Sequence, residues 1–207
     1  FFNKTLKQRR SLVEKTEVEY NLDLAKLLDG SINLTYQVPL LKLDNKQKFR
    51  DNNQLTNQKI VLFHPGYGGS SDGNLTLEGY LKLAKVIRNL PNIQVVWVFG
   101  PDDLDAKDKI KGLIPDTDII YHPSTLLDYC FLIRDSELLI STSTGPMHLA
   151  GALNIKTVSF FGNNLFASSK RWATVSETNK QLNIEIDKDY QQDLLKKIID
   201  SAIQKLN

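Results

Sequence analysis

A run of hydroxyl-bearing residues that leads into a proline is the strongest candidate for a ligand site in this sequence. Ser143 and Thr144 precede Gly145 and Pro146, and proline is favoured in the first turn of a helix. The free amides and the dipole at a helix N-terminus attract anions, and the hydroxyls add hydrogen-bond donors. The segment therefore predicts a site for an anion such as phosphate. His148 lies about one turn further on, where its ring could reach the same ligand or could be a buried core residue.

Glycine is concentrated in a second segment, which runs from His64 to Gly73 and reads HPGYGGSSDG. Because glycine lets the backbone approach a ligand closely, Gly68, Gly69 and Ser70 could cradle phosphate oxygens. A flexible surface loop is the alternative. The segment superficially resembles a dinucleotide-binding motif, but Ser71 takes the place of the third glycine, which disfavours an NAD-dependent oxidoreductase domain.

Acidic residues follow a further candidate strand, where a carboxylate could accept hydrogen bonds from both hydroxyls of a ribose. Asp102 and Asp103 occupy this position. Capping of the next helix is an equally good interpretation of Asp103. Asp103 and Asp105 also resemble a metal-binding pair, but residues two apart point to different faces of a helix, which favours a solvated surface and no metal.

The elements around these segments form a regular pattern after residue 58. Short apolar runs alternate with helical segments, which predicts a doubly wound parallel α/β sheet. In such a sheet ligands bind beyond the carboxyl ends of the strands, where the candidate segments lie. The expected strands are 59–63, 93–99, 118–121, 137–140 and 157–161, and the expected helices are 77–90, one capped by Ser124, 145–153 and 189–206.

The first 58 residues do not show this alternation of apolar strands and helices. Residues 16–29 are expected to be helical, because Thr16 and Glu19 have the spacing of a capping box and Gly30 can end the helix. Residues 32–43 are apolar and extended. Residues 44–58 are polar enough to predict a linker or a solvated loop.

Composition excludes several classes of protein. The 207 residues are 41% hydrophobic and 24% charged, which suits one sizeable globular domain with an appendage. A formal charge of +2 gives no electrostatic footprint for nucleic acid. Cys130 is the single cysteine, so an internal disulfide is excluded. Without a signal peptide or an apolar run near the roughly 20 residues of a membrane helix, we expect a cytoplasmic piece of a longer protein.

The segment from Ser143 to Leu153, STGPMHLAGAL, resembles the signature of family nine glycosyltransferases, the ADP-heptose:lipopolysaccharide heptosyltransferases. The strand and the Phe161-Gly162 that follow it fit the same pattern. The supporting matches are Pro65-Gly66, Leu77-Glu78-x-Tyr80, Gly100 before acidic residues, and Leu126-Leu127-Asp128.

The resemblance implies a GT-B glycosyltransferase, of which this chain holds one of two Rossmann-like domains. Residues 56–207 would be the C-terminal, donor-binding domain, and residues 1–55 the end of the N-terminal half and the interdomain linker. The donor would be a nucleotide-diphosphate sugar, ADP-heptose above all. The acceptor would be the core of lipopolysaccharide or lipooligosaccharide, bound by the missing half at the cytoplasmic face of the inner membrane. The family's general base is an Asp of that half, so we expect no catalytic residue here, no metal and no other cofactor.

The resemblance also assigns roles to the candidate residues. Amides of the glycine-rich loop and of the helix N-terminus would stabilise the departing diphosphate, an acidic residue would hold the ribose, and main chain near Ser124 would meet the base. The residues expected to bind the donor are Gly68, Gly69, Ser70, Asp102, Asp103, Ser124, Thr125, Ser143, Thr144, Gly145, His148 and Arg171.

Two positions depart from the family pattern. Ser143 stands where the family usually has Asp, and Gly73-Asn74-Leu75 stands where it has Lys-x-Trp, whose lysine contacts the donor's pyrophosphate. Losing that cation weakens leaving-group stabilisation unless another cation replaces it, and Lys170 and Arg171 are the nearest candidates. A catalytically inactive relative that still binds nucleotide sugar is therefore the alternative.

Overall fold

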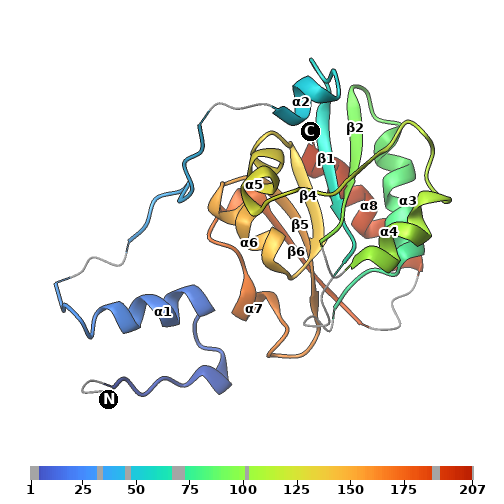
Figure 1. Ribbon diagram of the computed structural model, residues 1–207. Coiled ribbons are helices and arrows are strands. Elements are labelled where there is room, and N and C mark those ends of the chain that lie inside the picture. The colour runs from blue at the N-terminus through green and yellow to red at the C-terminus, as the bar shows by residue number, and fades with distance from the viewer. Residues whose placement is uncertain are drawn as a thin grey trace.

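The computed structural model describes residues 5–31, 35–44, 48–66, 73–100, 103–187 and 192–206, and it shows a parallel sheet with helices on both faces (Figure 1). The strands are β1 (Lys59–His64), β2 (Ile93–Val98), β3 (Ile119–Tyr121), β4 (Leu138–Thr142), β5 (Lys156–Gly162) and β6 (Gln181–Ile186). The helices are α1 (Glu17–Ala25), α2 (Lys48–Asn52), α3 (Leu77–Arg88), α4 (Leu104–Lys111), α5 (Leu126–Arg134), α6 (Gly145–Ala152), α7 (Ser169–Trp172) and α8 (Gln192–Leu206).

The strand order is β3-β2-β1-β4-β5-β6, and every pair is parallel. This confirms the predicted fold class. The chain proceeds from β1 toward one edge and from β4 toward the other, so the order reverses between these two neighbours. Ligands of open α/β sheets bind beyond the strand ends at such a reversal, here where His64 pairs with Ser141.

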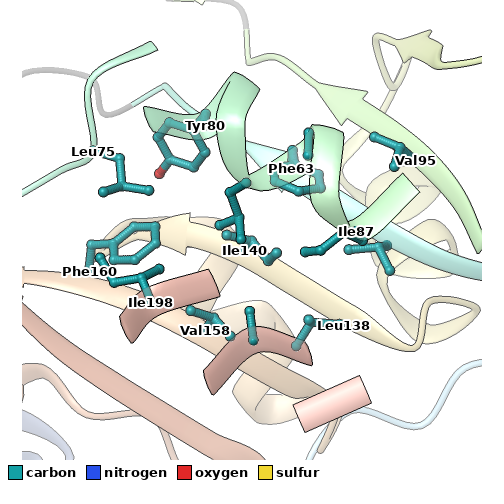
Figure 2. Close-up of a cluster of buried hydrophobic side chains, with 14 of the residues drawn as sticks. Phe63, Leu75, Tyr80, Ile87, Val95, Leu138, Ile140, Val158, Phe160 and Ile198 are labelled. Carbon is teal, nitrogen blue, oxygen red and sulfur yellow. The ribbon is translucent and has the colours of Figure 1, made fainter. Parts of the chain in front are cut away.

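Two apolar layers cover the sheet. On one face, residues of α3, α4 and α8 pack against Val61 and Phe63 of β1 and against Ile140, Val158 and Phe160 of the neighbouring strands, as Figure 2 shows in part. On the other face, residues of α2, α5 and α6 pack against the alternate side chains of β1, β2 and β4. The alternation explains why the strands read as continuous apolar runs.

The five predicted strands are present within about two residues of their expected bounds. The sixth, β6, was not predicted. Its Leu182, Ile184 and Ile186 pack into the core around α8, whereas Asn183 faces the opposite side of the sheet. This half-polar alternation is typical of an edge strand, which β6 is.

The N-terminal helix has the predicted capping box. The hydroxyl of Thr16 accepts a hydrogen bond from the amide of Glu19. The Glu19 carboxylate in turn accepts one from the amide of Thr16, with 2.8 Å between nitrogen and oxygen. The helix ends at Ala25 and does not extend to residue 29. After it, the amides of Leu27 and Leu28 donate to the carbonyls of Leu24 and Ala25, which is the three-residue spacing of a tighter turn. Figure 1 shows this segment beside α7 and away from the sheet.

The segment expected to be a solvated linker is partly packed. Phe49 of α2 is buried, with its ring centroid 4.9 Å from that of Tyr121. Leu55 is also buried, and the guanidinium of Arg50 donates to the carbonyl oxygens of Gln58 and Asp135 at 3.1 and 2.8 Å. These few anchors attach an otherwise polar segment to the end of the sheet where β1 and β4 begin.

Candidate functional site

The carboxyl end of β4 leads directly into α6, as the sequence predicts. Thr144 is the extended N-cap residue, Gly145 is exposed, and Pro146 lies in the first turn. The amide of Ser143 donates to the carbonyl of Phe160 at 2.9 Å, whereas the amides of Thr144 and Gly145 donate to no other group among the described residues. Two amides, a half-buried Ser143 and the helix dipole therefore converge on one exposed point.

The environment of His148 fits partly with each of its two predicted roles, a ligand contact and a buried core residue. It is half-buried on α6, and its ring contacts that of Trp172 edge-on at a centroid distance of 6.3 Å. Burial lowers its pKa, which favours the neutral ring. His148 is packed on one side by α7 and still accessible, so a contact with a ligand at the helix N-terminus stays a prediction.

Arg171 belongs to α7 and has a partner that no local sequence signal indicates. Its Nε donates to the Oε1 atom of Glu17 at 2.7 Å, across 154 positions of sequence, and its Nη2 lies 2.7 Å from the same oxygen in an ion pair. Its guanidinium also lies over the rings of Trp172 and Phe166, 4.9 and 5.5 Å from their centroids. Nη1 has no hydrogen-bond partner within the described ranges. Arg171 is thus held against Trp172, which also contacts His148, with donors available for an anion.

Asp103 lies at the start of α4, but its side chain does not cap that helix. Its carboxylate accepts the amide of Gly100 at 3.1 Å and lies 3.9 Å from Nε2 of His64. A Cβ built on Gly66 would stand 2.0 Å from the Asp103 Cγ, so a side chain there would displace the Asp103 carboxylate. The capping interpretation is therefore wrong, and Asp103 links the ends of β1 and β2. Its contact with a ribose stays a prediction.

Ser124 was expected to cap α5, but Thr125 does so instead. The hydroxyl of Thr125 accepts the amide of Asp128 at 3.0 Å and donates to its carboxylate at 2.8 Å. Both Ser124 and Thr125 are exposed beyond the end of β3. They lie on the same edge of the sheet as the N-terminus of α6, and their contact with a nucleotide base is untested.

Gly73 explains one departure from the family pattern. A Cβ built there would lie 2.0 Å from the backbone carbon of Phe161 and 2.2 Å from the amide nitrogen of Gly162. Real Cβ atoms do not approach backbone atoms so closely, so the site where the family has lysine accepts only glycine here. Gly68, Gly69, Ser70 and Asp102 lie outside the described residues.

Two histidines should make the stability of the fold depend on pH. Burial lowers the pKa of His64, with the Asp103 carboxylate and the Val98 carbonyl opposing the shift, and burial also lowers that of His148. The unfolded chain then binds protons below its histidine pKa of about 6.5 that the folded chain does not. The free energy of unfolding should be at its full value above that pH and should decrease as the pH falls toward 5.

Urea denaturation at pH 7.5 and 5.5 measures this effect. We expect a loss at the lower pH of at most about 1.4 kcal/mol per histidine for each pH unit. His148→Gln should reduce the difference between the two conditions. An equal free energy of unfolding at both pH values would contradict the burial of neutral rings.

The sequence of this chain matches the model of a known protein family. The model of glycosyltransferase family 9 (heptosyltransferase) matches residues 2–198, which is nearly the whole chain and includes the β4–α6 segment. The chain belongs to glycosyltransferase family 9. A Haemophilus influenzae protein that carries the name of a glycosyltransferase is 30% identical over 193 residues, covering 87% of this chain and 56% of the relative.

Solved structures share the fold with this family 9 chain. The glycosyl transferase family 9 structure from Veillonella parvula has a TM-score of 0.76 at 16% identity, covering 100% of this chain and 63% of that one. The structure of E. coli ADP-heptose lipopolysaccharide heptosyltransferase II has a TM-score of 0.67 at 21% identity, covering 84% and 55%. The sheet thus matches one half of GT-B heptosyltransferase structures, as the resemblance implies. The chain spans about half the length of the curated relatives it matches, 47% to 56%.

Among the described residues, no group of three or more His, Cys, Asp or Glu side chains is placed to hold a metal ion. None of the helices in this part of the chain combines the length and the apolar composition needed to cross a bilayer.

Proposed function

We propose that this family 9 chain is the donor-binding half of a glycosyltransferase that takes a sugar from a nucleotide diphosphate, with ADP-heptose as the donor. The observation that carries the proposal is the N-terminus of α6. Its Thr144 and Gly145 amides lack partners among the described residues, and they lie where the strand order reverses. A diphosphate bound there would accept hydrogen bonds from these amides. The helix dipole would stabilise its negative charge as it leaves the sugar.

The proposed acceptor is the core of lipopolysaccharide or lipooligosaccharide. It is supported by the family and by the name of the E. coli structure, an ADP-heptose lipopolysaccharide heptosyltransferase. We further propose that residues 56–207 are the donor domain and that residues 1–55 belong to the acceptor-binding half and its linker. The acceptor and the general base would then lie on the opposite side of a cleft between the halves.

The test obstructs the anion site while the fold is kept. Thr144→Val removes a hydroxyl donor, and Gly145→Ala adds a methyl group in the open space beside the two amides, where the diphosphate would lie. Together they should weaken ADP binding by about 1–3 kcal/mol, the usual cost of losing hydrogen bonds to a charged group. The variant should fold, because a Cβ on Gly145 meets no atom within 4 Å. Isothermal titration calorimetry with ADP measures the change.

The matched control makes the same two changes at the opposite edge of the sheet. Thr117 is exposed before β3, and a Cβ on Gly112 also meets nothing within 4 Å. Thr117→Val with Gly112→Ala should leave the ADP affinity unchanged. An unchanged affinity in the folded Thr144/Gly145 variant would remove this site from the proposal.

Arg171 is the proposed substitute for the missing lysine. Arg171→Ala should weaken ADP binding, because the Nη1 donors of this guanidinium would be lost beside the diphosphate. Lys82→Ala is the control: Lys82 pairs with Glu78 at 2.7 Å on the exposed surface of α3. Calorimetry that finds equal effects for the two variants would show that Arg171 serves only its ion pair with Glu17.

A further inference from the structure

The two ends of the β1–α3 connection are tied together by one side chain. Asn74 lies at the end that enters α3, and its amide Nδ2 donates to the carbonyl of Pro65 at 3.0 Å. Pro65 immediately follows β1, so this bond joins positions nine residues apart. The bond closes the base of the glycine-rich connection next to the reversal of strand order.

The orientation of the Asn74 amide is set from the core. The hydroxyl of Tyr80 donates to the Asn74 Oδ1 at 2.7 Å, which leaves Nδ2 directed at Pro65. The Tyr80 ring is fully buried, with centroids 6.5 Å from Phe63 and 5.8 Å from Phe160. Figure 2 shows this hydroxyl at the end of the cluster where Leu75 and Phe160 lie. A rigid aromatic side chain therefore fixes the Asn74 side chain.

The neighbouring residue is fixed to the opposite half of the sheet. The hydroxyl of Thr142, the last residue of β4, donates to the carbonyls of Gly73 and Phe160. The close approach of Gly73 to the Phe161 backbone keeps this end of the connection against β5. The connection after β1 is thus held at both ends relative to β4, from which α6 and its free amides begin.

We propose that Asn74 and Tyr80 are positioning residues for the diphosphate of the nucleotide donor, an inference that rests on the proposed function. They touch no ligand themselves. They fix the Pro65–Gly66 and Gly73 backbone beside the α6 N-terminus, so that donors from both sides of the strand reversal face one diphosphate. Without this tie, the backbone of Pro65, Gly66 and Gly73 would have to be fixed in position when nucleotide binds, and that cost would reduce the affinity.

Two substitutions test this role. Tyr80→Phe removes only the hydroxyl and keeps the buried ring, and Asn74→Ala removes the tie itself. Each should weaken ADP binding about fivefold, the effect of one lost hydrogen bond. Adenosine, which lacks the diphosphate, should bind each variant as it binds the wild-type chain. The ratio of the adenosine and ADP dissociation constants therefore reports on positioning, because a general loosening of the fold would weaken both ligands.

Tyr129→Phe is the matched control. It makes the same chemical change at another buried tyrosine, whose hydroxyl has no hydrogen-bond partner in the described part of the chain. It should alter neither dissociation constant. Thermal unfolding of all three variants establishes that each is folded at the titration temperature.

The outcomes separate the two proposals. Selective loss of ADP affinity in Tyr80→Phe and Asn74→Ala supports the positioning role. Folded variants with wild-type ADP affinity, or with equal losses for ADP and adenosine, would overturn it and leave the proposed function standing. A wild-type chain that does not bind ADP at all would overturn the proposed function and this inference with it.

Discussion

Sugar transfer by this 207-residue chain should be undetectable and should appear when the upstream half is joined to it. The described residues form one six-stranded sheet, and the exposed Gly145 of the candidate site lies at its carboxyl edge. In the proposed reaction the acceptor hydroxyl and its general base come from the other half of the enzyme. Holding the two reactants in the reactive geometry lowers the activation barrier by about 7–11 kcal/mol. An isolated donor half cannot supply this contribution.

Mass spectrometry of product, with ADP-heptose and truncated lipopolysaccharide as substrates, measures this difference. The isolated chain gives the baseline, and the chain joined to the N-terminal half of a longer relative gives the comparison. Turnover by the isolated chain would contradict both the half-enzyme proposal and the location of the base. If the joined protein binds ADP but transfers no sugar, the alternative is favoured: the protein is a catalytically inactive relative that still binds nucleotide sugar.

Restoring the family lysine should destabilise the fold and should not improve nucleotide binding. In Gly73→Lys the new Cβ would lie 2.0 Å from the Phe161 backbone, which cannot move without distorting the end of β5. We expect the free energy of unfolding to decrease by about 3 kcal/mol, in the upper range for overpacking. Urea denaturation measures it.

Gly112→Lys is the control for this change. Gly112 follows α4 in open space with a φ of −93°, so a lysine fits without strain. Its effect should stay within about 0.5 kcal/mol, as for most surface substitutions. A Gly73→Lys variant as stable as this control would show that the backbone of Phe161 and Gly162 shifts readily to admit a side chain at position 73.

The sheet could be predicted from sequence because its central strands are buried on both faces and read as apolar runs. The α6 start could be predicted because Thr144, Gly145 and Pro146 carry their preferences locally. β6 and α2 were not predicted because neither is a continuous apolar run. Each combines a few buried side chains with polar neighbours. Phe49 alone anchors α2 in a stretch that composition marks as solvated.

The site could be predicted only where its determinants lie within one segment. Local preference identified the α6 N-terminus, but two neighbouring hydroxyls, Ser124 and Thr125, compete for one cap position that the backbone decides. The pairing of Arg171 with Glu17 depends on a tertiary contact that no spacing encodes. The tie from Asn74 to Pro65 likewise depends on Tyr80, whose hydroxyl direction follows from core packing.

Calorimetric titration of the whole chain with ADP measures whether it binds a nucleotide diphosphate at the carboxyl edge of its sheet. We expect saturable binding of one ADP per chain, with NAD binding more weakly because the glycine-rich connection lacks the third glycine of a dinucleotide motif. No binding of ADP, or tighter binding of NAD than of ADP, would contradict the proposed function.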